Sequence, residues 1–193
     1  MAQPEHIDEF HYEIDEANRI VDVDRPWLAF ARANGAPELT REAVMGAGLF
    51  LYVAGWEAVR HYGELFDALR RSRSSATLPF RCDSPETRRD MELTMRADAK
   101  RHVHLTGRLL QRAARRAVPL LDVRTPRNGH WLVICSNCLQ LETDSGTWCE
   151  IETALVDPYV LPPQGLPRLS HTLCPSCARR FREAIQTARP LRA

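Results

Sequence analysis

Two cysteine pairs in the last third of the sequence restrict what that part of the chain can fold into. Cys135 and Cys138 form one Cys-x-x-Cys pair, and Cys174 and Cys177 form the other after 35 intervening residues. A turn of this kind directs two sulfurs at one point, with zinc–sulfur distances of about 2.3 Å, so two turns supply the four ligands of a tetrahedral zinc site. Four protein ligands leave no position for a substrate, so we expect a structural rather than a catalytic site.

Disulfides, free thiols and an iron–sulfur centre are the alternatives for these four cysteines. The first residues, MAQPEHIDEFHYE, are acidic and lack the charged and then apolar pattern of a signal peptide. No apolar run in the sequence approaches the roughly 20 residues that cross a bilayer. We therefore expect a cytoplasmic chain that does not enter a membrane, and in that compartment zinc is favoured over disulfides.

Length and charge limit the function further. The chain has 193 residues, which is room for one domain of about 110 to 120 residues and a small module. Its 26 basic and 25 acidic residues give a net charge of +1, which excludes a polycation built for nucleic acid. The sequence contains no kinase ATP-binding motif, no P-loop and no Rossmann glycine set, so we expect no enzymatic activity.

Residues 8–113 have the pattern of a mixed α and β domain. Apolar and polar residues alternate in five segments, and apolar residues at helical spacing separate the second segment from the third. The expected strands cover about residues 10–14, 20–23, 77–82, 91–96 and 102–109, and the longest expected helix covers about 56–71. Alternation with one polar face indicates a sheet packed on one side only. We therefore expect an α+β fold with a five-stranded antiparallel sheet and helices on one face.

Turn and cap residues mark the ends of several of these elements. Asn18 suits a tight turn between the first two strands. Asp24 is a good N-cap for a helix that has Pro26 in its first turn, and Gly35 suits the left-handed position after that helix. The segment 98–100 is expected to turn the last hairpin.

This order of elements resembles a PAS domain over roughly residues 8–113. The segment VMGAGLFLYVAG is similar to the family's G-x-x-L-F-x-Y-V segment, with matches at Gly46, Leu49, Phe50, Tyr52 and Val53. The resemblance implies a sensory domain with an apolar cavity between helices and sheet, and a homodimer. The expected cavity wall, which is equally consistent with a filled core, consists of Trp27, Phe50, Tyr62, Phe66, Phe80, Met91, Met95 and Leu105.

The rest of the chain divides into a linker and a small module. Residues 114–130 are expected to be a linker, because prolines and a glycine interrupt regular structure there. Residues 131–193 form the expected zinc-ribbon-like module, with a hairpin that turns at 144–146, an irregular loop over 156–167 and a C-terminal helix. A module of this size buries little core, so the metal would supply much of its folding free energy.

The module resembles the cysteine-rich tail that follows PAS or receiver domains in bacterial signalling proteins. That tail reads approximately I-C-x-x-C, then G-x-W-x-x-I-E, then S-H-x-x-C-P-x-C. The matches in this sequence are Ile134, Cys135, Cys138, Gly146, Trp148, Ile151, Glu152, Ser170, His171, Cys174, Pro175 and Cys177. The resemblance implies a bacterial signalling protein and a bound metal, and it implies no particular activity.

Four further residues have a functional and a structural interpretation. His171 is expected to form local hydrogen bonds, and the alternative is that it donates to a ligand sulfur. Cys82 and Cys149 are expected to be small core residues, and the alternative is that they are redox-active thiols. His61 on the long helix is the candidate haem ligand in a PAS fold, and haem is not favoured there.

The sequence therefore supports a non-enzymatic bacterial sensor. Its PAS-like domain would bind a small molecule or a protein partner and would be coupled to one structural Zn²⁺ ion. One alternative is a zinc-ribbon regulator that binds nucleic acid through arginines such as Arg179, Arg180 and Arg182, which is less favoured because such arginines usually form a solvated helix face. Another alternative is a redox switch that releases zinc when its thiolates are oxidised.

Overall fold

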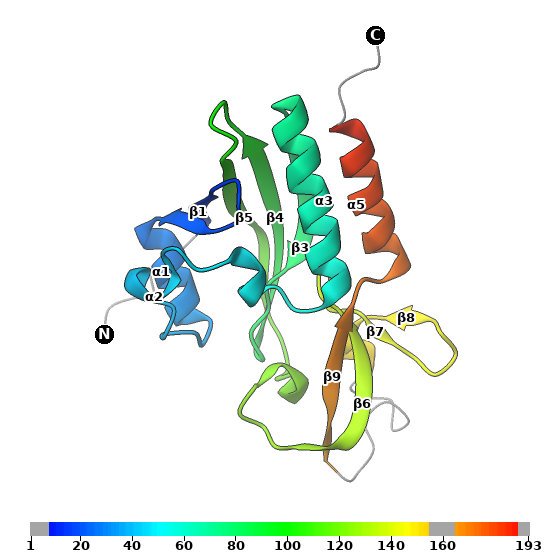
Figure 1. Ribbon diagram of the computed structural model, residues 1–193. Helices are drawn as coiled ribbons and strands as arrows, with labels where there is room; N and C mark the ends of the chain where they lie inside the picture. The colour runs from blue at the N-terminus through cyan, green and yellow to red at the C-terminus, as the bar shows by residue number, and fades with distance from the viewer. Residues whose placement is uncertain (1–7, 155–164, 189–193) are drawn as a thin grey trace.

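The structure is a computed structural model that describes residues 8–154 and 165–188. It contains two β-sheets and two long helices that lie side by side (Figure 1). In chain order the elements are β1 (Glu9–Ile14), β2 (Ile20–Val23), α1 (Arg25–Ala33), α2 (Arg41–Val44), η1 (Leu49–Tyr52), α3 (Trp56–Ser72), β3 (Ser75–Arg81), β4 (Thr87–Ala97), β5 (Val103–Ala114), η2 (Pro119–Leu121), β6 (Arg127–Cys135), β7 (Leu141–Glu142), β8 (Trp148–Cys149), α4 (Ile151–Ala154), β9 (Leu166–Thr172) and α5 (Pro175–Thr187).

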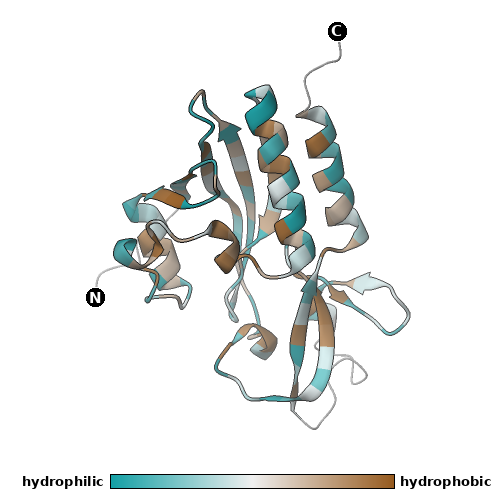
Figure 2. Cartoon of the chain, in the orientation of Figure 1, coloured by the Kyte–Doolittle hydropathy of each residue, from teal (hydrophilic) through white to brown (hydrophobic). Residues whose placement is uncertain are grey.

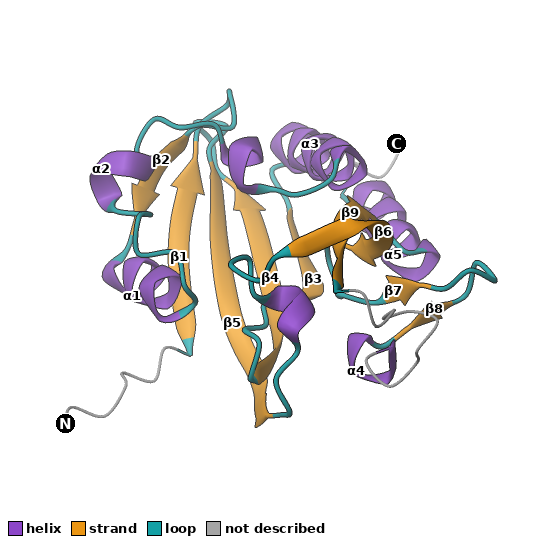
Figure 3. Cartoon of the chain, turned by 90° about the horizontal axis from the view of Figure 1, so that it is seen from below, coloured by secondary structure: helices purple, strands orange, loops and turns teal. Residues whose placement is uncertain are grey.

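The first sheet has the strand order β2-β1-β5-β4-β3, and all its neighbouring strands are antiparallel. β1 therefore lies between the edge strand β2 and the last strand β5, and the three later strands follow one another as hairpins (Figure 3). This arrangement confirms the PAS-like α+β fold expected from the sequence. β4 and β5 extend beyond the expected strands, because their ladder continues as far as the pair Thr87 and Ala114.

Local side-chain chemistry accounts for the first turn and the first helix. Asn18 has a φ of 58°, and the Asp15 carboxylate accepts hydrogen bonds from the backbone of the same turn. Asp24 Oδ1 accepts a hydrogen bond from the Trp27 N–H at 2.7 Å, so α1 begins at the expected N-cap. Gly35 follows α1 with a φ of 83°, which favours glycine.

The helices cover one face of the first sheet and leave the other face polar. Leu65 and Phe66 of α3 are fully buried and belong to the same core as Met95 of β4. Apolar and polar positions alternate along α3 and α5, as Figure 2 shows. The opposite face of the sheet carries polar pairs such as Thr77 and Thr94, whose hydroxyls are 2.9 Å apart. The predicted one-sided packing is therefore present.

The second sheet has the strand order β8-β7-β6-β9. β7 and β8 form the expected hairpin, with Gly146 at a φ of 75° in its turn. β6 and β9 pair in parallel, with Ile134 opposite His171. This pairing was not predicted, because β9 begins inside the segment expected to be an irregular loop. The residues of that loop from 156 to 164 lie outside the described residues.

Residues 114–130 contain η2 and the first residues of β6. The Val118 N–H donates to the Pro85 carbonyl, and Val118 and Leu120 are buried in a small second core together with Ile134. At the other end of the module, α5 packs against α3 and β3. The cysteine-containing part is therefore attached to the PAS-like part at both of its ends.

Candidate metal centre and aromatic cavity

The two cysteine pairs lie where two strands end and a helix begins. Cys135 is the last residue of β6, and Cys138 follows in a turn in which Leu139 has a φ of 61°. β9 leads to Cys174, which is the N-cap of α5. The helix begins there because the Cys174 sulfur accepts a hydrogen bond from the Cys177 N–H and a proline occupies the first turn.

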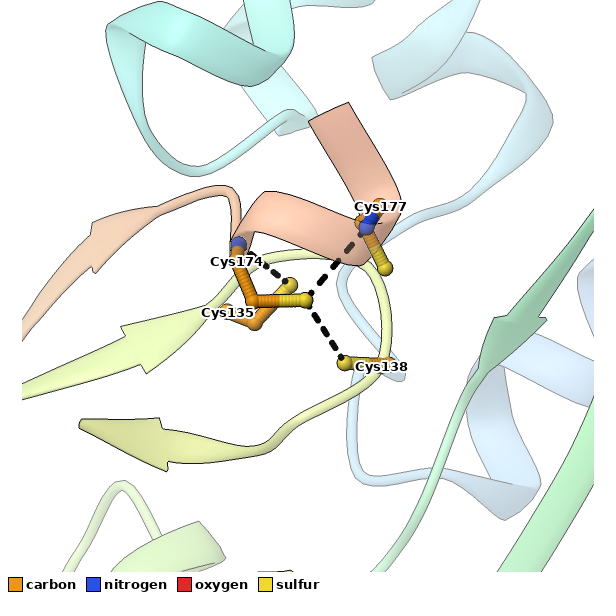
Figure 4. A group of neighbouring side chains, drawn as sticks. All are labelled: Cys135, Cys138, Cys174 and Cys177. Atoms are coloured by element: carbon orange, nitrogen blue, oxygen red, sulfur yellow. Dashed lines mark hydrogen bonds between the residues drawn. The ribbon is translucent and has the colours of Figure 1, made fainter. Parts of the chain in front are cut away.

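The four sulfurs converge on one point (Figure 4). All four lie within 4.8 Å of one another, and Cys138 Sγ is 3.6 Å from Cys174 Sγ. Sulfurs bound to one zinc ion at about 2.3 Å in a tetrahedron are about 3.8 Å apart. Cys135, Cys174 and Cys177 are buried, and Cys138 is partly exposed. The cluster is therefore compatible with one bound metal ion.

Several donors point at these sulfurs. The Cys174 N–H donates to Cys135 Sγ at 3.3 Å, and the Cys177 N–H donates to Cys174 Sγ at 3.4 Å. The Asn137 amide donates to Cys177 Sγ at 3.5 Å, and the Ser176 hydroxyl lies 3.1 Å from Cys174 Sγ. Such bonds stabilise thiolates. We had singled out neither Asn137 nor Ser176 from the sequence, although both lie between the paired cysteines.

Hydrogen bonds within the cluster separate the pKa values of its thiols. The hydrogen bond with Cys138 lowers the pKa of Cys135 to about 7, and the hydrogen bond with Cys135 strongly lowers the pKa of Cys174. Hydrogen bonds with Cys135 raise the pKa of Cys138 and of Cys177. The proton binding of the four thiols is therefore interdependent, and a divalent cation is the kind of partner that would bind all four as thiolates.

The turn of the first cysteine pair is attached to the outer edge of β3. The Asn137 side chain donates to the Pro79 carbonyl at 2.8 Å, and the Arg81 N–H donates to the Asn137 carbonyl at 2.8 Å. These bonds satisfy backbone groups that an edge strand would otherwise leave open. Asn137 thus links Cys177 of α5 to the PAS-like sheet.

The residues before the second pair are attached to the start of α3. The Glu57 carboxylate accepts hydrogen bonds from the Thr172 hydroxyl and from the Leu173 N–H at 3.1 Å, and the bond from Thr172 is the main cause of a lowered pKa of Glu57. Gly55 has a φ of 89°, and a Cβ placed on it would be 2.8 Å from the His171 carbonyl oxygen. Only glycine allows the two backbones to approach so closely here.

A cluster of ion pairs forms a third link between the two parts. Arg81 pairs with Asp83, Glu150 and Glu152, and Arg115 pairs with Asp83 and Glu152. Burial opposes ionisation of Glu152, but hydrogen bonds from Arg81 and Arg115 outweigh it and lower the pKa of that carboxyl to about 2. No local sequence pattern indicates this network, because its members lie far apart along the chain.

An apolar cavity of about 410 Å³ lies between the helices and the first sheet. Eight of its lining residues are aromatic and none carries a charged side chain. The rings of Phe10 and Phe30 are 4.9 Å apart in its wall, and a Cβ on Gly107 would be 2.3 Å from the Phe10 ring. Tyr52 lines the cavity and is 43% exposed, so the cavity reaches the surface there.

The structure brings together most of the residues that we expected in a cavity wall. The expected residues that line it are Trp27, Tyr62, Phe66, Phe80 and Leu105. Phe50 instead stacks on a neighbouring phenylalanine ring, and Met91 and Met95 are fully buried in the core. Lining residues that we did not expect include Phe10 of β1 and Phe30 of α1, whose positions depend on how α1 folds back onto the sheet.

The two isolated cysteines lie in apolar surroundings. Cys82 lines the cavity, and burial raises its pKa to about 11 although Arg89 lies close by. This environment disfavours a reactive thiolate at Cys82. Cys149 in β8 packs against the small second core.

The two histidines considered from the sequence lie apart from the cavity. His61 is buried against Phe181, with ring centroids 5.7 Å apart, and its Nδ1 is 2.8 Å from the Glu57 carbonyl. It is not among the residues that line the cavity. His171 lies in a shallow hollow with Leu169, and burial lowers its pKa. In the described part of the chain, the His171 ring is not among the donors to the sulfurs named above.

No protein-family model matches the chain, and no curated protein matches its sequence. Among solved structures, it is similar to the photoactive yellow protein domain from the sensor histidine kinase Ppr of Rhodospirillum centenum, with a TM-score of 0.41 and 17% identity over 56% of this chain and 97% of that domain. None of the described helices is long and apolar enough to span a bilayer. By its strand order the chain has a PAS-like fold, and this fold is joined to a four-cysteine cluster compatible with metal binding.

Proposed function

We propose that this chain is a non-enzymatic bacterial sensor in which a small molecule in the aromatic cavity changes the state of a structural zinc module. The observation that supports it most is the position of Tyr62. Its ring lines the cavity and packs edge-on against Phe181 of α5, with centroids 4.8 Å apart. The first turn of α5 carries Cys174 and Cys177. One side chain therefore contacts both the space for a ligand and the helix that carries two metal ligands.

Zinc is the metal that best suits the cluster. Four thiolates in two Cys-x-x-Cys turns form a closed tetrahedral set, which is typical of structural zinc. Bound zinc would join the turn after β6 to the start of α5 and would add to the free energy of folding. Metal analysis with an absorption spectrum tests this assignment. We expect one zinc per chain and no visible absorption, whereas iron with visible bands would contradict it.

Occupancy of the cavity would reach the zinc module through packing contacts. A ligand that fills the cavity favours one position of Tyr62 and hence of α3. α3 also contacts the second cysteine pair through Glu57, which accepts hydrogen bonds from the two residues before Cys174. By thermodynamic linkage, a ligand that binds better to the zinc-loaded chain must strengthen zinc binding by the same factor.

Zinc transfer to a chelator tests the coupling. Fluorene is an uncharged three-ring hydrocarbon that suits an apolar aromatic cavity. In competition with the chelator at equilibrium, we expect saturating fluorene to raise the zinc affinity of the full chain about fivefold, because allosteric couplings are typically about 1–3 kcal/mol. Phe181→Leu should reduce this difference while zinc still binds, and Trp131→Leu, at an exposed aromatic residue, should leave it unchanged. An unchanged zinc affinity with fluorene bound would contradict the proposal.

The signalling partner belongs to the same proposal. The resemblance of the tail to bacterial signalling proteins supports a protein partner or a homodimer, with the cavity ligand as the input. Sedimentation of the zinc-loaded chain with and without fluorene would show whether a dimer forms and whether the ligand changes it. A monomer under both conditions would exclude the homodimer.

A further inference from the structure

One residue that lines the aromatic cavity has a buried polar atom whose bonding capacity is not used. Asn34 ends α1 and lines the cavity. Its Nδ2 donates to the Phe30 carbonyl at 2.7 Å. Its Oδ1 is buried and has no hydrogen-bond partner among the described residues. A buried acceptor without a partner costs free energy, so this oxygen would be stabilised by a donor that enters the cavity.

The orientation of the Asn34 amide is fixed by its surroundings. Exchanging its nitrogen and oxygen would place the oxygen against the Phe30 carbonyl, where two acceptors repel each other. The same exchange would lose the 2.7 Å hydrogen bond. The amide atom of Asn34 without a partner is therefore an acceptor, and a donor on a ligand is the kind of group that can pair with it.

The rest of the cavity selects against charge. None of its lining residues is an acid, a lysine, an arginine or a histidine. Burial also raises the pKa of Tyr12 and Tyr62, so their phenols stay neutral. A charged ligand would lose its hydration without gaining an ionic partner. The flat faces of eight aromatic residues instead favour stacking and edge contacts with another aromatic system.

We propose that the cavity binds an uncharged, largely aromatic molecule that donates one hydrogen bond to Asn34 Oδ1. This inference rests on the proposed sensor function and specifies the class of its input. The cavity volume of about 410 Å³ is sufficient for a molecule of a few fused rings. Molecules with a carboxylate, a phosphate or an ammonium group are excluded from the class.

Three probes of nearly identical shape test the hydrogen bond. Carbazole, fluorene and dibenzofuran differ at one bridging position, which is an N–H donor, a CH₂ group and an oxygen acceptor respectively. Equilibrium dialysis of the zinc-loaded full chain gives the three dissociation constants. We expect carbazole to bind about tenfold more tightly than fluorene, and dibenzofuran no more tightly than fluorene. Fluorene-9-carboxylate should bind at least about a hundredfold more weakly than fluorene.

A matched pair of variants assigns the effect to one residue. Asn34→Ala should bring carbazole to the affinity of fluorene while fluorene binding is unchanged. Asn128→Ala removes a half-buried asparagine that does not line the cavity and should keep the tenfold preference. Retained fluorene binding shows that the Asn34 variant is folded, and the comparison of the three probes in the unmodified chain does not depend on any variant.

Each outcome supports or overturns a separate statement. Equal binding of carbazole and fluorene would overturn the donor class and leave the sensor cavity intact. A carbazole preference that persists in Asn34→Ala would overturn the role of Asn34. If none of the three neutral probes binds to the folded chain, both this inference and the cavity-based sensor function are wrong.

Discussion

The PAS-like part and the cysteine module differ in how they can be stabilised. The PAS-like part buries large side chains such as Phe66 and Leu69 in an extended core between α3 and the first sheet. In the described residues, the separate core of the module has five buried members, which are Val118, Leu120, Ile134, Leu141 and Ile151. A core this small supplies little hydrophobic stabilisation, so the module depends on its contacts with the larger part, and a metal bound by the four cysteines would add to them.

The boundary between the two cores does not follow the sequence. Cys135, Cys174, Cys177 and Phe181 come from the module, but they belong to the larger core. The metal cluster therefore lies at the junction of the two parts rather than inside an independent module. This position places the cluster in direct contact with the core of the PAS-like part.

Loss of one of the four clustered cysteines should have the largest effect, and it should destabilise the module but not the first sheet. In Cys174→Ala we expect zinc to be lost and the amides of β6 and β9 to lose protection from hydrogen exchange, because structural zinc contributes roughly 10 kcal/mol to small domains. Amides of β4 and β5 should stay protected. Cys149→Ala removes another cysteine of the module and should keep the zinc. Full zinc content and unchanged exchange in Cys174→Ala would refute a stabilising metal.

A side chain at Gly55, where the start of α3 contacts the backbone of β9, should have the next largest effect on stability. Gly55→Ala places a methyl group 2.8 Å from the His171 carbonyl and requires a left-handed alanine, so we expect a loss of about 2–4 kcal/mol in urea unfolding. Gly63→Ala, inside α3 and 3.9 Å from the nearest atom, is the matched control and should stabilise by up to about 1 kcal/mol. Equal stability of the two variants would show that the close contact does not form.

The ion-pair cluster should make the smallest contribution to folding stability, and it should make it only when its carboxylates are ionised. The pKa of Glu152 is about 2 in the folded chain and 4.5 ordinarily, so its stabilisation is present above about pH 4.5 and is lost as the pH falls toward 2. We expect Glu152→Gln to lower the free energy of unfolding by about 1 kcal/mol at pH 7 and by less at pH 3.5. The effect is small because the carboxyl group is partly exposed. Because the variant and the unmodified chain share all other titrating groups, the difference between their unfolding free energies reports on Glu152.

A control keeps this measurement specific. Glu183→Gln, at an exposed position on α5, should change stability little at either pH. A cost of Glu152→Gln that stays constant between pH 7 and pH 3.5 would assign it to lost packing rather than to charge.

Features that depend on neighbours in the sequence could be predicted. The turn at Asn18, the N-cap at Asp24 and the spacing of the cysteine pairs each involve residues a few positions apart, and the structure has all three. Features that join distant segments could not be predicted. The parallel pairing of β6 with β9 and the contact of Asn137 with Pro79 have no local signal, because they depend on which surfaces meet.

The sequence by itself determined the alternation that builds the first sheet, and it determined which four thiols can share a metal. The tertiary structure alone decided that the wall of an aromatic cavity also touches the helix of the second cysteine pair, through Tyr62 and Phe181. It also decided that Asn34, which lines that cavity, has a buried oxygen without a hydrogen-bond partner among the described residues. Short-range patterns fix local geometry, whereas the packing of distant segments fixes which groups remain free to bind.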